Sequence, residues 1–520
     1  MQLLLYQSVS APNLPLICAV RRAILWGMTT PLSALILSPK AMSAVDRAAA
    51  ESGIDSYGLM RRAGEAVAAA ALKHHPGSLR FAVLCGPGNN GGDGFVAACA
   101  LARAGAVVDV FLLGETHDLR GDAALARAGW TGLVRPLADY KPQEGDVVID
   151  AVFGAGLTRA VPERLAAVMD AVTRATVPVL SVDLPSGVDG RSGAVLGSAF
   201  HASRSITFMT RKPGHLLMPG RSLAGEVEVV DIGIPARILR AVPADVAENG
   251  PLIWGAEART LDAATHKYKR GHLVVFSGGA LMTGAARMSA LAALHSGAGL
   301  VSLAAPEAAL AANAVHLTAI MLRHVEDRAQ LNDLLADGRI KTFVLGPGFG
   351  DLEKARAYAL ALSDRQLVLD ADGITAFKQD PNLLFNAFAA GETRLVLTPH
   401  EGEFARLFPD LAQDDGLSKV DKALSAARRA HAVVLYKGAD TVIAAPDGRA
   451  VINAHAPPFL ATAGSGDVLA GMIGAHLAQG MPAFEAAAAA AWRHGAAGFA
   501  AGPGLSAETL IDHIAPLPRL

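Results

Sequence analysis

The sequence predicts an α/β protein with two domains, each built on a mainly parallel sheet. Two series of short apolar strands alternate with helical segments, which is typical of parallel α/β sheets. A segment with several prolines and no long apolar period separates the two series, and residues 236–261 are therefore expected to form a linker. The chain has 520 residues, about three times the length of a common single domain. We expect domains at residues 36–235 and 262–520.

The first 35 residues are expected to form an extension of doubtful structure. They are apolar with scattered prolines, and Arg21 and Arg22 fall in the middle of the segment. A secretory signal places its positive charge first and ends in a small-residue cleavage site, and this segment does neither. A dispensable extension, with Met28 as an alternative start, is the simpler interpretation.

The first series of elements begins at Ser38 and Pro39. Serine caps free helical amides and proline lacks an N–H, so this pair predicts the start of a helix that ends near Glu51. A second helix is expected from Ser56 to His74. The other expected elements are strands at 81–84, 107–113, 147–149 and 179–182, and a helix at 95–104 after a glycine-rich loop.

The second series resumes after the linker. Its expected strands lie at 272–276, 300–303, 342–345, 367–369, 395–397 and 433–436, with helices at 468–477 and 485–497. Exposed alanine-rich helices in this half favour association, so we expect a homo-oligomer.

Composition excludes several classes of function. The chain has 46 basic and 48 acidic residues, and this balance argues against binding nucleic acid or a membrane surface. Only three cysteines occur, without a CxxC pair, which excludes a disulfide framework and a cysteine zinc site. The sequence has no run of 18 strongly apolar residues without charge or proline, so we expect no membrane-spanning segment. A cytoplasmic protein with small-molecule partners is expected.

Polar residues in the first half follow the ends of predicted parallel strands. Ligands bind outside the carboxyl ends of such strands, where Gly86–Gly94, Asp150 and Asp183 all fall. The glycines allow backbone amides to approach a phosphate, and the Asn and Asp side chains among them add oxygens. Alternatively, the loop is only a tight turn, Asp150 caps the next turn and Asp183 accepts from local amides. Arg159 fits phosphate binding and a solvated surface charge equally well.

In the second half, small residues precede an apolar helix. Gly464, Ser465 and Gly466 would expose free amides that stabilise phosphate charge, and Asp467 follows where it can take a proton from an attacking hydroxyl. A glycine-rich cap without function is the alternative. His400-Glu401 begins an H-E pair, but Phe404 occupies the position of the second histidine in a zinc protease. His400 is therefore either a packed histidine or a substrate contact.

Three motifs in the first half occur in the order seen in NAD(P)H-hydrate epimerases, at residues 88–94, 150–157 and 183–187. Thr207-Phe208 and Lys212-Pro213-Gly214 also fit, and the resemblance covers residues 36–235. It implies a Rossmann-like three-layer fold that interconverts the epimers of hydrated NADH and NADPH. Asp183 would be catalytic and contact the reacting ring, while Asn90, Asp150 and Ser186 would supply oxygens to K⁺. The implied substrate-binding residues are Asn89, Asn90, Gly91, Gly92, Asp93, Gly154, Ala155, Gly156, Leu157, Thr158, Arg159, Ala160 and Asp183.

The second half resembles the ribokinase-like superfamily and, more narrowly, the ADP/ATP-dependent NAD(P)H-hydrate dehydratases. The motifs are His266-Lys267, Gly278-Gly279, residues 282–286, 296–301 and 370–373, and those around Gly348, His400, Lys437 and Asp467. The chain differs from the pattern of this family at two places. Tyr268-Lys269-Arg270 stands where a glycine often follows the His-Lys pair, and Ala280 stands where serine is common.

The second resemblance also implies site residues. Ala285, Gly348, His400 and Asp467 would bind the hydrated nucleotide, and Lys437, Gly438, Ala439, Asp440, Thr441 and Gly466 would bind ADP or ATP with Mg²⁺. Asp467 would be catalytic by activating the ring hydroxyl to attack the terminal phosphoryl group, after which phosphate leaves and NAD(P)H is restored. The resemblance favours ADP as the donor.

Together the two resemblances predict a bifunctional repair enzyme, an isomerase joined to a lyase. The alternative is a ribokinase-like small-molecule kinase fused to a non-catalytic nucleotide-binding module.

Overall fold

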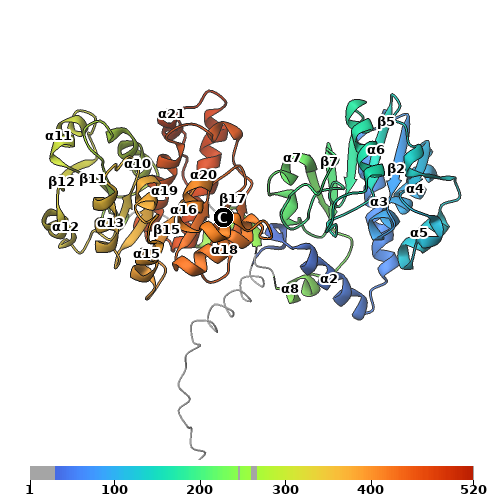
Figure 1. Cartoon of the computed structure of the whole chain (residues 1–520), viewed down its shortest axis with the longest axis horizontal. Coiled ribbons are helices and arrows are strands. Elements are labelled where there is room, and N and C mark those ends of the chain that lie inside the picture. The colour runs from blue at the N-terminus through green and yellow to red at the C-terminus, as the bar shows by residue number, and fades with distance from the viewer. Residues whose placement is uncertain (1–29, 244–245, 259–265, 519–520) are drawn as a thin grey trace, which may run out of the picture.

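The computed structural model describes residues 30–243, 246–258 and 266–518, and forms the two expected α/β domains (Figure 1). Most of the expected extension, residues 1–29, lies outside the described part, as do residues 244–245 and 259–261 of the expected linker. None of the helices within the described part is long and apolar enough to cross a membrane.

The N-terminal domain is a seven-stranded parallel sheet in the order β4-β3-β2-β5-β6-β7-β8. Helices α3 and α4 pack on one face and α6 on the other, which gives the expected three layers. The strands are β2 Arg80–Cys85, β3 Val108–Leu112, β4 Val134–Pro136, β5 Asp146–Ala151, β6 Val179–Val182, β7 Arg204–Phe208 and β8 Glu226–Val230. The helices are α2 Pro39–Glu51, α3 Ser56–His74, α4 Asn89–Arg103, α5 Gly121–Gly129, α6 Glu163–Arg174, α7 Gly220–Ala224 and α8 Ala236–Ala241.

Most of the expected glycine-rich loop is helix, because α4 begins at Asn89 and not at Phe95. The reason is close packing of the helix against the sheet. A Cβ on Gly91 would lie 1.9 Å from the Gly86 carbonyl oxygen, and one on Gly94 would lie 2.5 Å from the Ala151 Cβ. These glycines let the first turns of α4 approach the strand ends. By contrast, Ser38 caps α2 by accepting from the Ala41 amide, as predicted.

The C-terminal domain is an eleven-stranded sheet in the order β1-β9-β18-β17-β16-β15-β14-β13-β10-β11-β12. Strands β10 to β16 are parallel, while β17 is antiparallel to both of its neighbours. The strands are β1 Leu35–Ile36, β9 Val246–Glu248, β10 His272–Phe276, β11 Leu300–Ala305, β12 Met321–His324, β13 Thr342–Leu345, β14 Gln366–Leu369, β15 Leu395–Leu397, β16 Val433–Tyr436, β17 Thr441–Ala444 and β18 Ala450–Asn453.

Helices cover both faces of this sheet, and two apolar clusters lie between the layers. Helix α19 begins at Ser465, so the residues expected to precede the helix form its first turn. The helices are α9 Pro251–Trp254, α10 Thr283–His295, α11 Glu307–Ala314, α12 Arg328–Leu335, α13 Leu352–Ala361, α14 Ala371–Thr375, α15 Pro381–Phe388, α16 Glu401–Leu407, α17 Pro409–Gln413, α18 Lys419–Ala430, α19 Ser465–Ala478, α20 Ala483–Ala501 and α21 Ala507–Asp512.

Two short strands join the domains. Strand β1, from the end of the expected extension, pairs with β9 from the expected linker at the edge of the C-terminal sheet. In the same linker, Ile238 and Leu239 of α8 enter the N-terminal core, and Trp254 enters the C-terminal core. Each segment is too short to show an apolar period, although each buries apolar side chains.

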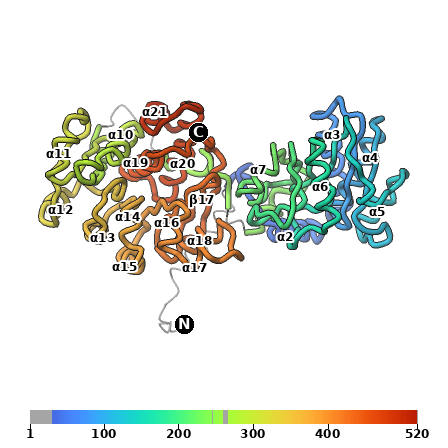
Figure 2. Tube along the Cα trace, turned by 45° about the horizontal axis from the view of Figure 1, so that its top comes forward, coloured from blue at the N-terminus to red at the C-terminus, as the bar shows by residue number. Residues whose placement is uncertain are grey.

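Further contacts hold the domains together. Helix α7 lies on the side of the N-terminal domain that faces β17 and α18 (Figure 2). Arg221 of α7 donates to the carbonyl oxygens of Ala439 (2.9 Å) and Ala454 (2.7 Å). The Met218 amide donates to Asp440 Oδ2 at 2.8 Å. These bonds connect residues more than 200 positions apart in the sequence.

Candidate functional sites

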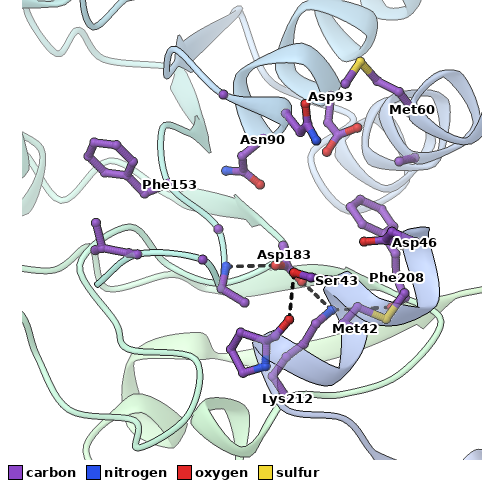
Figure 3. A pocket seen from close by; sticks show the side chains of 18 of the residues that line it. Met42, Ser43, Asp46, Met60, Asn90, Asp93, Phe153, Asp183, Phe208 and Lys212 are labelled. Atoms are coloured by element: carbon purple, nitrogen blue, oxygen red, sulfur yellow. Dashed lines mark hydrogen bonds and ion pairs between the residues drawn. The ribbon is translucent and has the colours of Figure 1, made fainter. Parts of the chain in front are cut away.

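The N-terminal domain has a cavity of about 690 Å³ at the carboxyl end of its sheet. In Figure 3, Asn90 and Asp93 of α4 lie on one side of it and Asp183, which follows β6, on another. The structure brings most of the predicted substrate-binding residues to its lining: Asn89, Asn90, Asp93, Gly154, Ala155, Gly156, Leu157, Thr158, Arg159 and Asp183. Gly91, Gly92 and Ala160 are not part of the lining; Gly91 packs against Gly86 and Gly92 against Met60.

Asp183 is held in one orientation by three donors. Its Oδ2 accepts from the Ala155 amide (2.9 Å), and its Oδ1 accepts from Lys212 Nζ (2.6 Å) and Thr207 Oγ1 (2.8 Å). Burial alone would raise the pKa of Asp183, but the charge of Lys212 and the hydrogen bonds from Lys212 and the Ala155 amide act in the opposite direction, and that pKa is lowered to about 2. Asp183 is therefore an ionised carboxylate at neutral pH. The alternative, in which Asp183 only accepts from local amides, does not account for its ion pair with Lys212.

His215 supports the backbone of Asp183. Its Nδ1 accepts from the Lys212 amide (2.9 Å), so the proton is on Nε2, which donates to the Asp183 carbonyl oxygen (2.7 Å). Burial lowers the pKa of His215 to about 4, so the ring stays neutral. Asp183 has a φ of 65°, a left-handed conformation that this hydrogen bond helps to hold.

Two of the three residues expected to bind K⁺, Asp150 and Ser186, form an oxygen-rich, buried group. Asp150 is fully buried and accepts from the Ser186 hydroxyl (2.5 Å) and amide (2.7 Å). It also accepts from the Val152 amide at 3.3 Å, which agrees with the alternative interpretation that Asp150 caps the next turn. Asn90 has a buried amide nitrogen with no partner among the described residues. The carboxylate of Asp150 and the hydroxyl of Ser186 are the kind of oxygen that a large monovalent cation prefers, and Asn90 would add its amide oxygen, whereas its amide nitrogen is a hydrogen-bond donor and cannot be a ligand.

Sequence reasoning gave no role to several residues of the cavity. Asp46 of α2, Lys212 and Phe208 line it, together with Met42, Ser43 and Met60. Lys212 belongs to the Lys212-Pro213-Gly214 motif of the first resemblance, so the sequence does contain a signal for it. Asp46 lies on an ordinary amphipathic helix, and no pattern distinguishes it from a solvated charge.

In the C-terminal domain, Asp467 lies in the first turn of α19. Gly464 caps this helix with a φ of +84°, and a Cβ there would lie 2.7 Å from Met288 Cε. Burial, supported by the nearby Asp370 carboxylate, raises the pKa of Asp467 to about 6, although Lys437 opposes the shift. A carboxylate with this pKa, beside free helical amides, is suited to accept a proton near neutral pH.

Lys437 lies between three acidic groups. Its Nζ is 2.6 Å from Asp370 Oδ1 and 3.7 Å from Glu403 Oε2, and its charge acts on Asp467. Burial would lower the pKa of Lys437, but these carboxylates raise it. A Cβ on Gly466 would lie 3.5 Å from Lys437 Nζ and 3.7 Å from Asp370 Oδ2. The predicted base Asp467, the predicted nucleotide-binding residue Lys437 and Gly466 therefore lie close together in one site.

Ala285 and Gly348 lie side by side. A Cβ on Gly348, whose φ is +58°, would be 3.1 Å from the Ala285 Cβ. His400 caps α16, where its Nδ1 accepts from the Gly402 amide at 3.0 Å. Its side chain is 55% exposed, so the packed-histidine alternative is wrong and a substrate contact stays a prediction.

The remaining predicted nucleotide-binding residues lie next to the N-terminal domain. Asp440 accepts from Lys419 Nζ (2.5 Å) and from the Met218 amide (2.8 Å). The Ala439 carbonyl accepts from Arg221, while Thr441 Oγ1 donates to the Gly438 carbonyl at 2.8 Å. The segment 438–441 is thus fixed by contacts from both domains.

Comparison with known proteins gives a family for each half. The model for the YjeF-related protein N-terminus matches residues 56–214, and the model for NAD(P)H-hydrate dehydratase matches residues 273–515.

Similar proteins extend over both halves. The chain is 37% identical to a bifunctional NAD(P)H-hydrate repair enzyme Nnr from Moorella thermoacetica, over 88% of this chain and 90% of that one. It is 35% identical to the enzyme of the same name from Thermofilum pendens, over 90% and 93% of the two chains. A solved ADP/ATP-dependent NAD(P)H-hydrate dehydratase from Bacillus subtilis matches at a TM-score of 0.41 and 25% identity, over 50% of this chain and 92% of that one.

Proposed function

The chain belongs to the family of bifunctional NAD(P)H-hydrate repair enzymes, and from this premise we propose how its two sites divide the work. The N-terminal domain epimerises the hydrates of NADH and NADPH, and the C-terminal domain dehydrates one epimer back to NAD(P)H with ADP or ATP. One observation carries the proposal: each half has a carboxylate near the carboxyl ends of its parallel strands, since Asp183 follows β6, and Asp467, in the first turn of α19, lies near Asp370, which follows β14.

At the N-terminal site, we assign different tasks to two carboxyl groups. Asp183 is ionised and can stabilise the positive charge that the ring acquires as its hydroxyl leaves. Burial raises the pKa of Asp93 well above its usual range, with Asp183 adding to the effect, which favours the protonated form of Asp93. This form can give its proton to the departing hydroxyl, which leaves as water. A water then adds to the other face of the ring and releases a proton to solvent, from which Asp93 is protonated again, so the centre is inverted with no net change in protons.

Asn90, Asp150 and Ser186 would hold K⁺ behind this site. When bound, the cation would supply a fixed positive charge that helps to bind the substrate phosphates. The chain itself fixes the surrounding backbone, since Ser186 Oγ accepts from the Phe153 amide at 2.8 Å, directly before Gly154.

At the C-terminal site, Asp467 takes the proton of the ring hydroxyl, which then attacks the terminal phosphoryl group of the nucleotide. The free amides at the start of α19 stabilise charge on that group. Lys437 orients the phosphates, and the Mg²⁺-bound nucleotide enters as co-substrate. The phosphorylated hydroxyl is then a good leaving group. Loss of phosphate from its ring carbon, with loss of a proton from the neighbouring ring carbon to solvent, restores the double bond of NAD(P)H.

The test is recovery of NADH absorbance from a mixture of both hydrate epimers, with ADP or ATP and Mg²⁺. We expect full recovery with one phosphate released per NADH. Asp183→Ala should stop recovery at the epimer that the dehydratase accepts, and Asp467→Asn should abolish it. No recovery by the unmodified chain with either nucleotide, or a stable phosphate ester as product, would favour a small-molecule kinase.

Two further expectations remain proposals. A cytoplasmic location fits an enzyme whose substrates are nicotinamide nucleotides. Homo-oligomer formation also stays a prediction, but the alanines at 486–490 of α20 are fully buried within the domain and offer no surface to a second copy.

A further inference from the structure

One face of helix α2 lines the cavity of the N-terminal domain. Pro39, Met42, Ser43 and Asp46 are all part of the lining, and their spacing of i, i+3, i+4 and i+7 places them on the same side of the helix. Asp46 is the one charged residue among these four, and the mechanism proposed above gives it no task.

The Asp46 carboxylate is open to the cavity and has no partner. The residue is exposed, and no hydrogen bond or ion pair from the described residues engages its oxygens. On the helices packed against α2, Arg62 of α3 donates to the Ile232 carbonyl oxygen and Arg240 of α8 donates to that of Thr30, so neither pairs with Asp46. A ligand in the cavity can therefore contact this carboxylate directly.

Asp46 belongs to the same group of charges as the residues proposed to act on the substrate. The charges of Lys212 and Asp183 act on Asp46, and the charge of Asp46 acts in turn on Asp93. Figure 3 shows the three carboxyl groups at one cavity, Asp46 from α2, Asp93 from α4 and Asp183 after β6. Asp122 of α5 also lines the cavity, but its charge is not among those that shift the pKa of Asp46 or Asp93.

The three carboxyl groups differ in protonation. Protein surrounds most of Asp46, and this burial raises its pKa to about 6; Lys212 opposes the shift and Asp183 adds to it. Asp46 is thus mainly ionised at neutral pH and can accept a proton, whereas the raised pKa of Asp93 favours its protonated form. Asp183, with a pKa lowered to about 2 and three donors on its oxygens, is a weak base.

Building on the proposed function, we propose that Asp46 is a second catalytic acid–base residue of the epimerase and acts on the face of the ring opposite to Asp93. On the first face, the bond between the ring carbon and its hydroxyl breaks as the Asp93 proton joins the departing oxygen, and water leaves. On the other face, a water forms the new carbon–oxygen bond and gives its proton to Asp46. Solvent takes this proton from Asp46 and returns one to Asp93, so no proton is gained or lost. In the reverse direction the two residues exchange roles.

Asp46→Asn tests the proposal, because an amide has nearly the size of the carboxylate but cannot take up the proton. Glu51→Gln is the matched control, since it is the same chemical change on the same helix, at an exposed position outside the lining. Asp46→Glu keeps a carboxylate at the site. Exchange of the two hydrate epimers by each full-length variant is followed by chromatography between pH 5 and 8, and thermal unfolding checks that each variant is folded.

We expect Asp46→Asn to lower kcat for epimer exchange by about 100-fold or more, as loss of a general base predicts, with KM little changed. In the unmodified chain kcat/KM should fall below about pH 6, where Asp46 becomes protonated, and Asp46→Asn should no longer show this fall. Asp46→Glu should recover part of the rate, and Glu51→Gln should behave like the unmodified chain.

Three results would overturn the proposal. They are an unchanged kcat in folded Asp46→Asn, a rise in KM alone, and a lower kcat in which the fall of kcat/KM below about pH 6 persists. Failure of the unmodified chain to exchange the epimers would instead overturn the proposed function.

Discussion

At the level of single residues, Asp183 and Asp467 lie in opposite electrostatic environments. Lys212 contacts Asp183 directly and lowers its pKa to about 2, whereas burial and Asp370 raise the pKa of Asp467 to about 6. The first is suited to stabilise positive charge and the second to take up a proton. The same residue type therefore serves two chemistries through its neighbours.

The dehydratase should lose activity in acid because Asp467 must be ionised to act as a base. Below about pH 6, kcat/KM should fall tenfold per pH unit. Because Lys437 lowers the pKa of Asp467, Lys437→Met should shift this acidic loss of kcat/KM to higher pH, in addition to weakening nucleotide binding. Initial rates of NADH formation between pH 5 and 8 give the profile. If kcat/KM falls at the same pH in Lys437→Met as in the unmodified chain, a group other than Asp467 controls the acidic loss of activity.

The epimerase should depend on Lys212 through the charge of Asp183. In Lys212→Met, burial no longer meets an opposing cation, so the pKa of Asp183 should rise. Epimer exchange, followed by chromatography of the two hydrates, should slow by about 100-fold or more at pH 7 and decline further as the pH falls. Lys73→Met, on the exposed part of α3, is the control and should behave like the unmodified chain. If the rate of epimer exchange is unchanged in Lys212→Met, the charge of Asp183 has no part in the mechanism.

At the level of elements, the sequence predicted the buried strands well because each is a continuous apolar run. The strands at 179–182, 272–276 and 342–345 have the predicted bounds. It misplaced the start of α4, since glycines usually mark loops and here serve close packing. Strands β1 and β9 were missed because they have two and three residues and depend on pairing across the chain.

The glycines of α4 should be required for packing and not for backbone freedom. Gly91→Ala would gain about 1 kcal/mol in helix propensity, but its Cβ would overlap the Gly86 carbonyl oxygen. We expect a net loss of about 1–3 kcal/mol in the free energy of unfolding of the N-terminal domain. Thermal unfolding measures it.

Gly88→Ala is the matched control at the start of the same helix. Nothing lies within 4 Å of its Cβ position, so the loss should stay below about 1 kcal/mol. Equal stability of the two variants would show that α4 shifts freely on the sheet.

At the level of the whole molecule, the candidate sites depend on contacts that no local pattern encodes. The motifs placed Asp183 and Lys437 at strand ends and Asp467 at the start of a helix, but they gave no sign that Asp440 accepts from the Met218 amide. That bond depends on the docking of two domains, which neither hydrophobic periodicity nor composition specifies.

This docking predicts a link between the N-terminal domain and the dehydratase. Arg221 and Met218 fix the segment 438–441, which follows Lys437 directly. Arg221→Ala removes the donors to the Ala439 and Ala454 carbonyls and should loosen that segment. We expect the KM for ADP or ATP to rise about two- to fivefold, as loss of one or two partly exposed hydrogen bonds predicts. The epimerase rate should not change.

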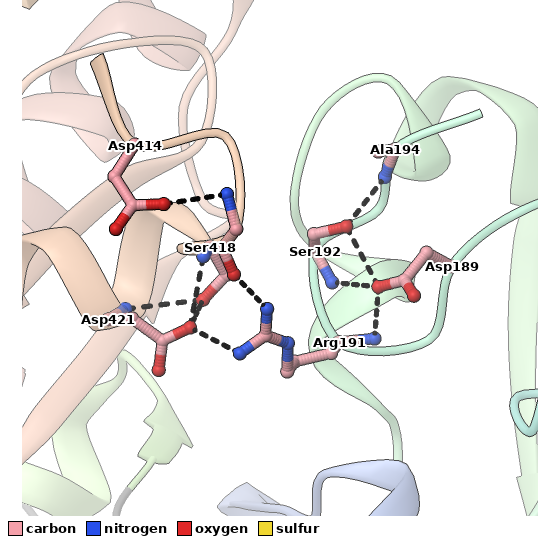
Figure 4. A network of polar contacts seen from close by, with 8 residues as sticks. Asp189, Arg191, Ser192, Ala194, Asp414, Ser418 and Asp421 are labelled. Atoms are coloured by element: carbon pink, nitrogen blue, oxygen red, sulfur yellow. Dashed lines mark hydrogen bonds and ion pairs between the residues drawn. The ribbon is translucent and has the colours of Figure 1, made fainter. Parts of the chain in front are cut away.

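The control for Arg221→Ala is a second arginine at the same interface. Arg191 contacts Asp421 at 3.1 Å and the Gly416 carbonyl, and none of its contacts reaches the segment 438–441 (Figure 4). Arg191→Ala should therefore weaken docking without a specific effect on nucleotide affinity. If both variants raise the KM for nucleotide equally, docking as a whole supports the dehydratase. If only Arg221→Ala does so, the N-terminal domain acts on the nucleotide site through α7, and an isolated C-terminal domain should bind nucleotide more weakly than the full chain.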